Sequence, residues 1–262
     1  GVFMSCLSPA EILDFISKKG EEKLHYSFKK LFTLGIMGGA YIALGYLAYI
    51  RVVGTMPSQW GSFSGFIGAG IFPVGLMAVT FAGAELLTGN MLVMPVAYYT
   101  KAIKLKDVLY NWLIITISNA IGAFSVAYFL GHFIGFTEGA FLSKTIAVAT
   151  AKISDPPLVA LVSGIGCNIF VGLGVWMAAI TKDISGKVLV IWFSITAFVA
   201  IGFQHIVANM FIIPAAIFSG QSSITWIDYI SNAFPVYIGN VIGGAVCLGL
   251  VYYIAYGQDI KK

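Results

Sequence analysis

A chain of 262 residues with a net charge of +4 could hold one or two soluble domains, but its composition excludes them. Hydrophobic residues make up 59% of the chain and charged residues only 10%, and the mean hydropathy is +0.91. Soluble domains carry about 25% charged residues. The sequence therefore predicts an integral membrane protein, and nothing in it supports nucleic-acid binding.

Residues 1–30 precede the first long apolar run and contain a helix-start signal. Ser8, Pro9 and Glu11 have the spacing of an N-cap, a proline at N1 and a capping-box glutamate. The apolar residues that follow fall on one helical face: Ile12, Phe15 and Ile16. We expect residues 1–30 to form an amphipathic N-terminal helix on the cytoplasmic surface of the bilayer.

Six apolar runs follow, each long enough to cross a hydrocarbon core, which takes about 20 helical residues. They are Leu31–Ile50, Gly65–Ala97, Val108–Phe133, Leu158–Ile180, Val188–Phe218 and Ala233–Tyr256. The second and fifth runs have 33 and 31 residues. As straight helices they would reach about 45–50 Å, so we predict that both are broken.

The basic residues between the runs predict the orientation, because lysine and arginine gather on the cytoplasmic side. If the N-terminus is cytoplasmic, 12 of the 15 basic residues lie on that side. The opposite side then holds Arg51, Lys144 and Lys152. We therefore expect both termini in the cytoplasm. The three cysteines form no CxxC pair, and we expect no metal and no cofactor.

The two long runs are related to each other. "GAELLTGNMLVMPVA", from Gly83, aligns without gaps to "GFQHIVANMFIIPAA", from Gly202, with five identities in fifteen positions. Chance would give about one. "NAIGA" from Asn119 likewise matches "NVIGG" from Asn240. The chain thus reads as two copies of a three-span unit, residues 31–134 and 158–256, within one transmembrane domain.

A unit with an odd number of spans enters the membrane from opposite sides in its two copies, so the copies are expected to be inverted. Overlong, glycine- and proline-interrupted segments at matching places point to a substrate path at the midplane. Each break should start a second half-helix, with Asn90 or Asn209 as its candidate N-cap. Two helix N-termini at the centre would favour an anion.

Few ionisable groups lie inside the runs. His205 is the one histidine deep in a span and Glu85 the one acidic residue in a span. We interpret His205 as a pore residue, with a packing role as the alternative. Glu85 fits better as an acceptor for loop N–H groups, because an anion path would avoid an exposed carboxylate. Thr88 could serve substrate or backbone, and Asn168 could face the path or bond a neighbouring helix.

These residues resemble the formate/nitrite transporter family, which includes formate, nitrite and hydrosulfide channels. "AGAELLTGNM" from Ala82 and "GFQHIVANM" from Gly202 are similar to the signatures of its two broken helices, and "CNIFVGLGVWMA" from Cys167 resembles its fourth-span motif. The similarity extends over essentially the whole chain. Within the family, the pattern is most like the hydrosulfide branch. Formate channels often have glutamate before the histidine, whereas this chain has Gln204.

The resemblance implies an all-α, aquaporin-like protomer of six spans, assembled as a homopentamer in the lipid bilayer of a bacterial plasma membrane, with one pore per protomer. It implies that small monovalent anions are the substrates. By the same resemblance the pore and substrate residues are His205, Thr88, Asn209, Asn168 and Lys152. The residues implied for the hydrophobic constrictions are Phe72, Leu76, Leu87, Phe198 and Val207, and those supporting the breaks are Glu85, Gln204 and Asn90.

A bare anion in an apolar constriction would carry a large desolvation cost. Our hypothesis is that Lys152 and the half-helix ends attract weak-acid anions, and that His205 with Thr88 hydrogen-bonds or protonates them. Alternatives are an aquaporin-type pore for neutral solutes and a proton-coupled symporter. An aquaporin-type pore predicts "NPA" caps and a constriction arginine, which the sequence lacks. An enzyme would need a nucleophile with its base or a metal cluster, and no such motif is present.

Overall fold

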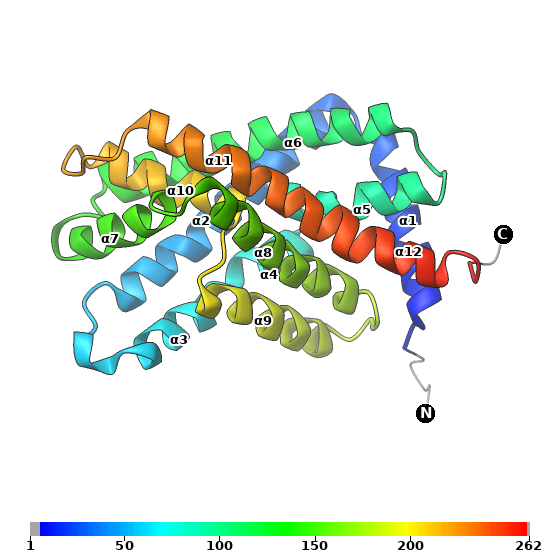
Figure 1. Ribbon diagram of the computed structural model, residues 1–262, viewed down its shortest axis with the longest axis horizontal. Helices are drawn as coiled ribbons and strands as arrows, with labels where there is room; N and C mark the ends of the chain where they lie inside the picture. Colours follow the sequence, from blue (N-terminus) through cyan, green and yellow to red (C-terminus); the bar gives the residue numbers. More distant parts are fainter. Residues whose placement is uncertain (1–5, 261–262) are drawn as a thin grey trace.

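The protein is all-helical over residues 6–260, the part of the chain that the computed structural model describes (Figure 1). Six helical segments in this part are long and apolar enough to cross a membrane. Their bounds are Phe28–Val53, Ser62–Ala82, Leu105–Phe133, Pro157–Ala178, Ile184–Ile201 and Trp226–Tyr256. The prediction of an all-α membrane protein with six spans is confirmed. Residues 1–5 of the predicted N-terminal segment and the last two residues, 261–262, lie outside the described residues.

The first helix, α1 (Pro9–Glu22), begins with the expected capping box, in which Ser8 and Glu11 cap each other's backbone N–H groups. Its buried side chains include Ile12 and Ile16, whereas Phe15, expected on the same face, is 41% exposed. The buried face packs against α5 (Leu87–Tyr99). A Cβ atom at Gly20 would lie 2.5 Å from the Ala97 Cβ atom, so this close contact requires glycine. A 3₁₀ turn, Lys23–His25, follows α1.

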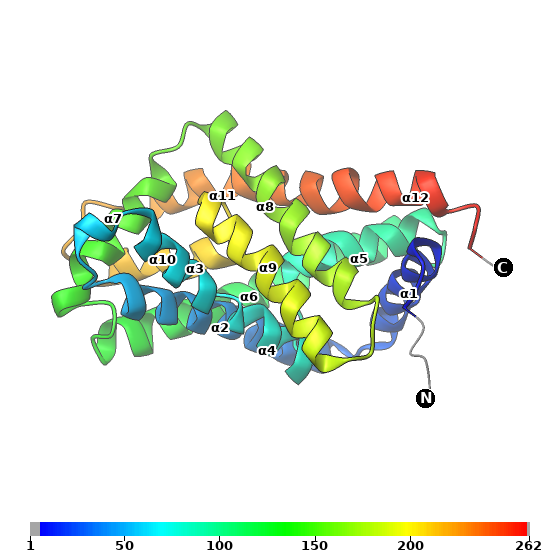
Figure 2. The same ribbon diagram turned by 90° about the horizontal axis from the view of Figure 1, so that it is seen from below.

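Two parallel helix pairs frame the molecule: α2 (Phe28–Val53) packs along α6 (Leu105–Ser125), and α8 (Pro157–Ala178) packs along α11 (Trp226–Val241) (Figures 1 and 2). Glycines let the backbones approach in both pairs, as is common between membrane helices. Both α6 and α11 continue as π-helical segments. These are Val126–Phe133 and Ile242–Leu250, the latter followed by α12 (Val251–Tyr256).

The two overlong runs are divided into shorter helices. The first comprises α3 (Ser62–Ile71), α4 (Val74–Ala82) and α5, and the second comprises α9 (Ile184–Ile201) and α10 (Ile206–Phe218). Helices α4 and α9 end at Gly83 (φ +81°) and Gly202 (φ +89°), in the left-handed conformation that glycine adopts without strain. An additional interruption at Phe72–Pro73 separates α3 from α4. The sequence repeat predicts only the break near Gly83 in this run, although a proline, which has no N–H, favours an interruption here as well.

The connection from residue 134 to residue 157 is not a plain loop. It contains a 3₁₀ turn, Gly139–Phe141, and the helix α7 (Leu142–Ile153). Another 3₁₀ turn, Ser58–Trp60, lies between α2 and α3. Helix α7 lies at one end of the molecule, and α1 and α12 lie together at the other end (Figures 1 and 2). The predicted inversion of the two halves, 31–134 and 158–256, stays a prediction.

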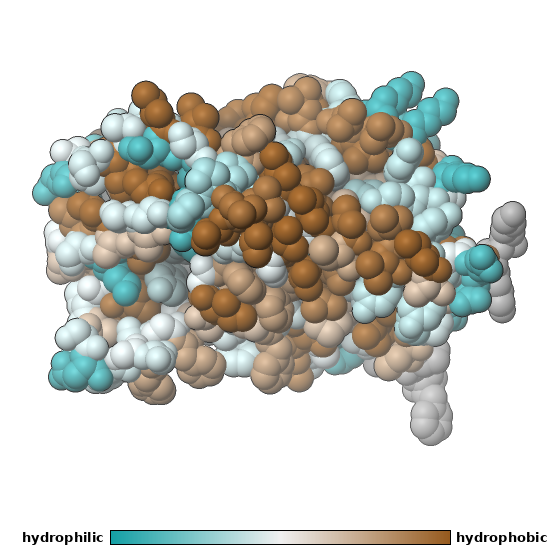
Figure 3. Space-filling view, in the orientation of Figure 1, coloured by the Kyte–Doolittle hydropathy of each residue, from teal (hydrophilic) through white to brown (hydrophobic). Residues whose placement is uncertain are grey.

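The surface and the core fit a protein surrounded by lipid. Apolar side chains cover the middle of the visible face, and hydrophilic side chains gather towards its two ends (Figure 3). Many large apolar residues are exposed on the spans, for example Leu113, Phe193 and Phe234. By contrast, α5 and α10 are buried along most of their length at the centre. Gly83 and Gly202 are exposed, but the breaks run inwards from them to the buried starts of α5 and α10, where unpaired backbone groups need partners.

Candidate functional site

The first break, residues 83–86, is held by one asparagine of α6. The Asn119 side chain accepts a hydrogen bond from the N–H of Leu87 (2.9 Å). Its amide nitrogen donates to the carbonyl oxygens of Glu85 (2.9 Å) and Gly35 (2.6 Å). Asn119 is fully buried. One side chain therefore satisfies the backbone on both sides of the break and ties it to α2.

The second break, residues 203–205, is held in the same way by an asparagine of α11. Asn240 accepts from the N–H of Ile206 (2.9 Å) and donates to the carbonyl oxygens of Gln204 (3.0 Å) and Gly164 (2.8 Å). Asn119 and Asn240 are the matching asparagines of the "NAIGA" and "NVIGG" motifs. The sequence repeat thus corresponds to a repeated hydrogen-bonding arrangement around two breaks.

The expectation that Asn90 and Asn209 cap the half-helices is wrong. Leu86 and His205 are the N-cap residues, and each asparagine lies one turn inside its helix. The side chains reach back across the break instead. Asn90 donates to the Glu85 carboxylate (2.8 Å), and Asn209 donates to the Gln204 side-chain oxygen (2.7 Å).

Glu85 also differs from its expected role. Its carboxylate forms an ion pair with Lys23 and accepts from Asn90, rather than accepting from loop N–H groups. Asn90 donates further to Asn111 of α6 (2.9 Å). A buried carboxylate needs such partners, because its desolvation is costly. The network therefore fastens the 3₁₀ turn after α1 to the first break.

Gln204 occupies the equivalent place at the second break and carries no charge. Its amide nitrogen donates to the carbonyl oxygen of Lys152 (2.9 Å) and to the carboxylate of Asp155 (2.8 Å). Asn209 completes the network by donating to Asn232 (2.9 Å). At the first break Lys23 and Glu85 form an ion pair. At the second break the residue equivalent to Glu85 is the uncharged Gln204, so it forms no ion pair with Lys152.

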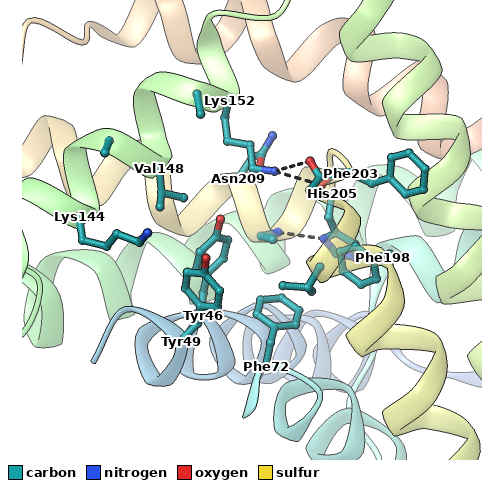
Figure 4. A pocket seen from close by; sticks show the side chains of 15 residues that line it. Tyr46, Tyr49, Phe72, Lys144, Val148, Lys152, Phe198, Phe203, His205 and Asn209 are labelled. Atoms are coloured by element: carbon teal, nitrogen blue, oxygen red, sulfur yellow. Dashed lines mark hydrogen bonds between the residues drawn. The ribbon is translucent and has the colours of Figure 1, made fainter. Parts of the chain in front are cut away.

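Lys152, at the end of α7, holds the second break directly. Its ammonium donates to the carbonyl oxygens of Gly202 and Phe203, both at 3.1 Å (Figure 4). Burial lowers the pKa of this ammonium, and the nearby Cys167 and Asp155 raise it. Asn168 of α8 bonds across helices, donating to the carbonyl oxygens of Thr88 (3.2 Å) and Asn240 (2.7 Å). The expected interhelical hydrogen bond of Asn168 is therefore present.

His205 and Thr88 join the two breaks. The Nε2 atom of His205 lies 2.9 Å from the Thr88 hydroxyl oxygen, and both residues are buried. The Nδ1 atom of His205 accepts from the N–H of Ala208 (3.0 Å) as the N-cap of α10. An accepting Nδ1 has no proton, so a neutral ring carries its proton on Nε2 and donates it to Thr88. The Thr88 hydroxyl proton is then available for another acceptor.

A cavity of about 340 Å³ reaches His205 from the α7 end of the molecule (Figure 4). It is mainly apolar, with polar groups at a few places. Its aromatic wall is continuous: the His205 ring stacks on Phe198 (5.7 Å between centroids), and Phe198 meets Phe72 edge-on (5.9 Å). The lining comprises Tyr46, Tyr49, Phe72, Lys144, Ala147, Val148, Ala151, Lys152, Phe198, Val199, Gly202, Phe203, His205, Ala208 and Asn209.

The cavity brings together part of the predicted set of site residues. Five of the predicted residues line it: His205, Asn209, Lys152, Phe72 and Phe198. Five others lie buried beyond its wall: Thr88, Asn168, Leu76, Leu87 and Val207. Sequence reasoning missed Tyr46, Tyr49 and Lys144 as lining residues. A signal for Lys144 was available, because Lys144 and Lys152 lie two helical turns apart in a connection rich in helix-forming residues.

Comparisons with known proteins agree with this architecture. A family model described as "Formate/nitrite transporter" matches residues 10–254. The chain is 53% identical to the transporter YrhG of Bacillus subtilis, over 99% of this chain and 97% of that protein. It is 46% identical to the formate channel BtFdhC of Bacillus thuringiensis, over 98% of both. A probable formate transporter of Methanothermobacter thermautotrophicus is 38% identical, over 96% of this chain and 98% of that protein.

Two solved structures are similar over nearly the whole fold. A channel described as an FNT family ion channel superposes with a TM-score of 0.87 at 26% identity, covering 93% of this chain and 98% of that one. A pentameric formate channel with formate bound gives a TM-score of 0.76 at 26% identity, covering 87% and 97%. Two of the relatives above are described as a formate channel and a probable formate transporter. The greater likeness of this chain to the hydrosulfide branch therefore stays a prediction. The family model and the relatives establish that this chain belongs to the formate/nitrite transporter family.

Proposed function

We propose that this protein is a channel for small monovalent anions of weak acids, and that formate is the first substrate to test. Membership of the formate/nitrite transporter family supports an anion channel in the membrane. The relative at 46% identity is described as a formate channel. Nitrite and hydrosulfide are weak-acid anions of similar size and stay in the proposal as further substrates.

The observation that carries this proposal is the contact of Thr88 with His205, which lines the inner end of the cavity. An anion entering an apolar passage loses its water and needs other hydrogen-bond donors. The Thr88 hydroxyl can donate to the anion, because it accepts its own hydrogen bond from Nε2–H of His205. The N-termini of α5 and α10 add positive dipole ends beside the same point.

The tautomer of His205 limits what the ring can do. Protonating Nδ1 would place a second N–H against the N–H of Ala208 and break the N-cap of α10. In this arrangement, therefore, His205 acts as a hydrogen-bond donor through Thr88. Proton donation from the ring to the anion would require α10 to release its cap. We therefore favour hydrogen bonding of the anion over its protonation by His205.

Lys152 supplies the charge that draws anions towards His205. It lines the cavity and lies at the second break. Phe72 and Phe198 form the apolar constriction before His205, and Leu76, Leu87 and Val207 form the apolar wall beyond it. Glu85, Gln204 and Asn90 support the breaks. In this proposal Asn168 and Asn209 position the ends of the half-helices rather than acting as gates.

We propose a homopentamer with one pore in each protomer, because a similar structure is described as pentameric. Several relatives of this chain are bacterial, which supports the proposal that the protein lies in a bacterial plasma membrane. The distribution of lysines supports cytoplasmic termini, with α7 and its cavity then facing outwards. Residues 1–30 form the cytoplasmic N-terminal segment in this proposal.

The function is tested by uptake into proteoliposomes that contain the purified protein. Formate, nitrite, hydrosulfide and chloride are compared at equal concentration, with protein-free liposomes as the control. We expect saturable uptake of at least one weak-acid anion, formate first, and chloride at the background rate. Equal uptake of all four anions, or background rates for all three weak-acid anions, would contradict the proposal.

A further inference from the structure

We propose that Lys144 forms an outer capture site for monovalent anions, one step before Lys152 on the way to His205. This inference rests on the proposed channel function and concerns how an anion enters. Neither the sequence pattern nor the family signatures quoted above include Lys144. It is a positioning residue in this account, because it gathers anions at the entrance and does not touch the central contact of Thr88 with His205.

The first observation is that Lys144 lies between two cavities. It lines the 340 Å³ cavity that ends at His205, and it also lines a second cavity of about 520 Å³. Only Lys144 and Ala147 are common to the linings of the two. The second cavity also contains three serines, Ser58, Ser64 and Ser143. An anion passing from the outer hollow to the inner one therefore passes the Lys144 side chain.

The second observation concerns charge. Lys144 forms no ion pair or hydrogen bond within residues 6–260, and no acidic side chain lines either cavity in that part of the chain. Figure 4 shows Lys144 and Lys152 extending from the same helix at the cavity. At the opposite end of the molecule Lys23 is neutralised by Glu85. The α7 end thus has two lysines that no carboxylate neutralises by an ion pair.

Lys144 and Lys152 attract an entering anion one after the other. The two lysines are eight positions apart, which corresponds to about 12 Å along the axis of α7. That is close to the Debye length of about 8–10 Å at physiological salt, so each lysine attracts an anion over its own stretch of the path. Cavities lined by one sign of charge between apolar walls focus the field and raise the rate of entry. The three serine hydroxyls can hydrogen-bond an anion that is still partly hydrated.

The experiment compares Lys144→Gln with Lys144→Arg and Lys182→Gln in proteoliposomes, with formate as the probe. Lys144 is half-buried and forms no hydrogen bond or ion pair within residues 6–260, so its replacement removes no polar contact from the fold. Lys182 is exposed in the connection between α8 and α9. This connection lies near the start of α1, as the hydrogen bond from the Leu7 N–H to the Ile180 carbonyl oxygen shows. Lys182→Gln provides the same loss of charge at the other end.

At low ionic strength and low formate, we expect Lys144→Gln to reduce the initial uptake about threefold to tenfold. The uptake at saturating formate should be unchanged, and the deficit should disappear in high salt. Lys144→Arg and Lys182→Gln should behave like the unmodified protein. If Lys144→Gln and Lys182→Gln show the same uptake and salt dependence, the capture site is refuted while the channel function stands. If the unmodified protein takes up no formate, the same comparison is made with nitrite or hydrosulfide, and uptake of none of the three means that the proposed function itself fails.

Discussion

Replacement of His205 by phenylalanine is expected to reduce formate uptake by roughly tenfold to a hundredfold. The phenylalanine ring can still stack on Phe198, so the apolar wall of the cavity is kept. The variant loses the hydrogen bond that orients the Thr88 hydroxyl towards the anion. A hydrogen bond to a charged group contributes about 1.5–3 kcal/mol, and each 1.4 kcal/mol corresponds to about a factor of ten. The measurement is initial uptake into proteoliposomes between pH 5 and pH 8.

His25→Phe is the control for this variant, because His25 lies exposed in the 3₁₀ turn after α1. It changes the same atoms far from the cavity and should leave uptake as it is. If His205→Phe kept the flux, the pH dependence and the anion preference of the unmodified protein, the assigned role of His205 would be wrong. Loss of the Ala208 cap should also cost about 1 kcal/mol of stability, which thermal unfolding in detergent can measure separately.

Replacement of Asn119 by leucine is expected to destabilise the fold by at least about 3 kcal/mol. Leucine branches at the same carbon, but it leaves the N–H of Leu87 and the carbonyl oxygen of Glu85 without the partner that Asn119 provides. It also places a methyl group where the amide bonded the Gly35 carbonyl at 2.6 Å. Asn240→Leu should have a similar cost, because Asn240 makes the matching bonds at the second break.

The measurement for both asparagine variants is the thermal unfolding midpoint of purified protein in detergent, together with its yield. Thr116→Val provides a control on α6, because the Thr116 hydroxyl donates within its own helix to Trp112 and contacts Tyr237. That change should cost no more than about 1.5 kcal/mol. Asparagine variants with the stability of Thr116→Val would show that the breaks do not depend on these side chains.

The six spans and the two breaks could be predicted from the sequence, because the chain contains an internal repeat. The spans follow from apolar length, and the alignment of Gly83 with Gly202 placed both interruptions within a few residues of where helices α4 and α9 end. Glycines are reliable markers there, because each adopts a positive φ. The division at Pro73, in the same run, has no counterpart in the repeat and is not predicted by it.

The contacts inside the site could be predicted less well, because they depend on which side chains meet across helices. Asparagine is a common N-cap, so the sequence predicts Asn90 and Asn209 at the starts of the half-helices. In the structure each amide finds a better partner across the break, in Glu85 or Gln204. The ion pair of Glu85 with Lys23 joins residues 62 positions apart, and local patterns do not specify such a pair. The π-helical segments in α6 and α11 likewise have no local sequence rule.

Helix α7 and its lysine cavity are not predicted from the sequence, for a different reason. Its apolar face is short and half-buried, so hydropathy alone grouped it with a connection between spans. Only the folded chain shows that Lys144 and Lys152 share one cavity with His205. The resemblance to a family supplied Lys152 but gave no reason to consider Lys144. Its position between two cavities could be found only from the three-dimensional arrangement.

Thr88 and His205 act as one unit in the proposed channel, and a cycle of two single variants and the double variant measures their coupling. Formate uptake is measured for Thr88→Val, for His205→Asn and for both together; asparagine can still accept from Ala208 and so keep the cap of α10. Residues that act as a unit give strongly non-additive losses. We predict that the double variant is no slower than the slower single variant. Losses that multiply, as for two independent residues, would contradict the claim.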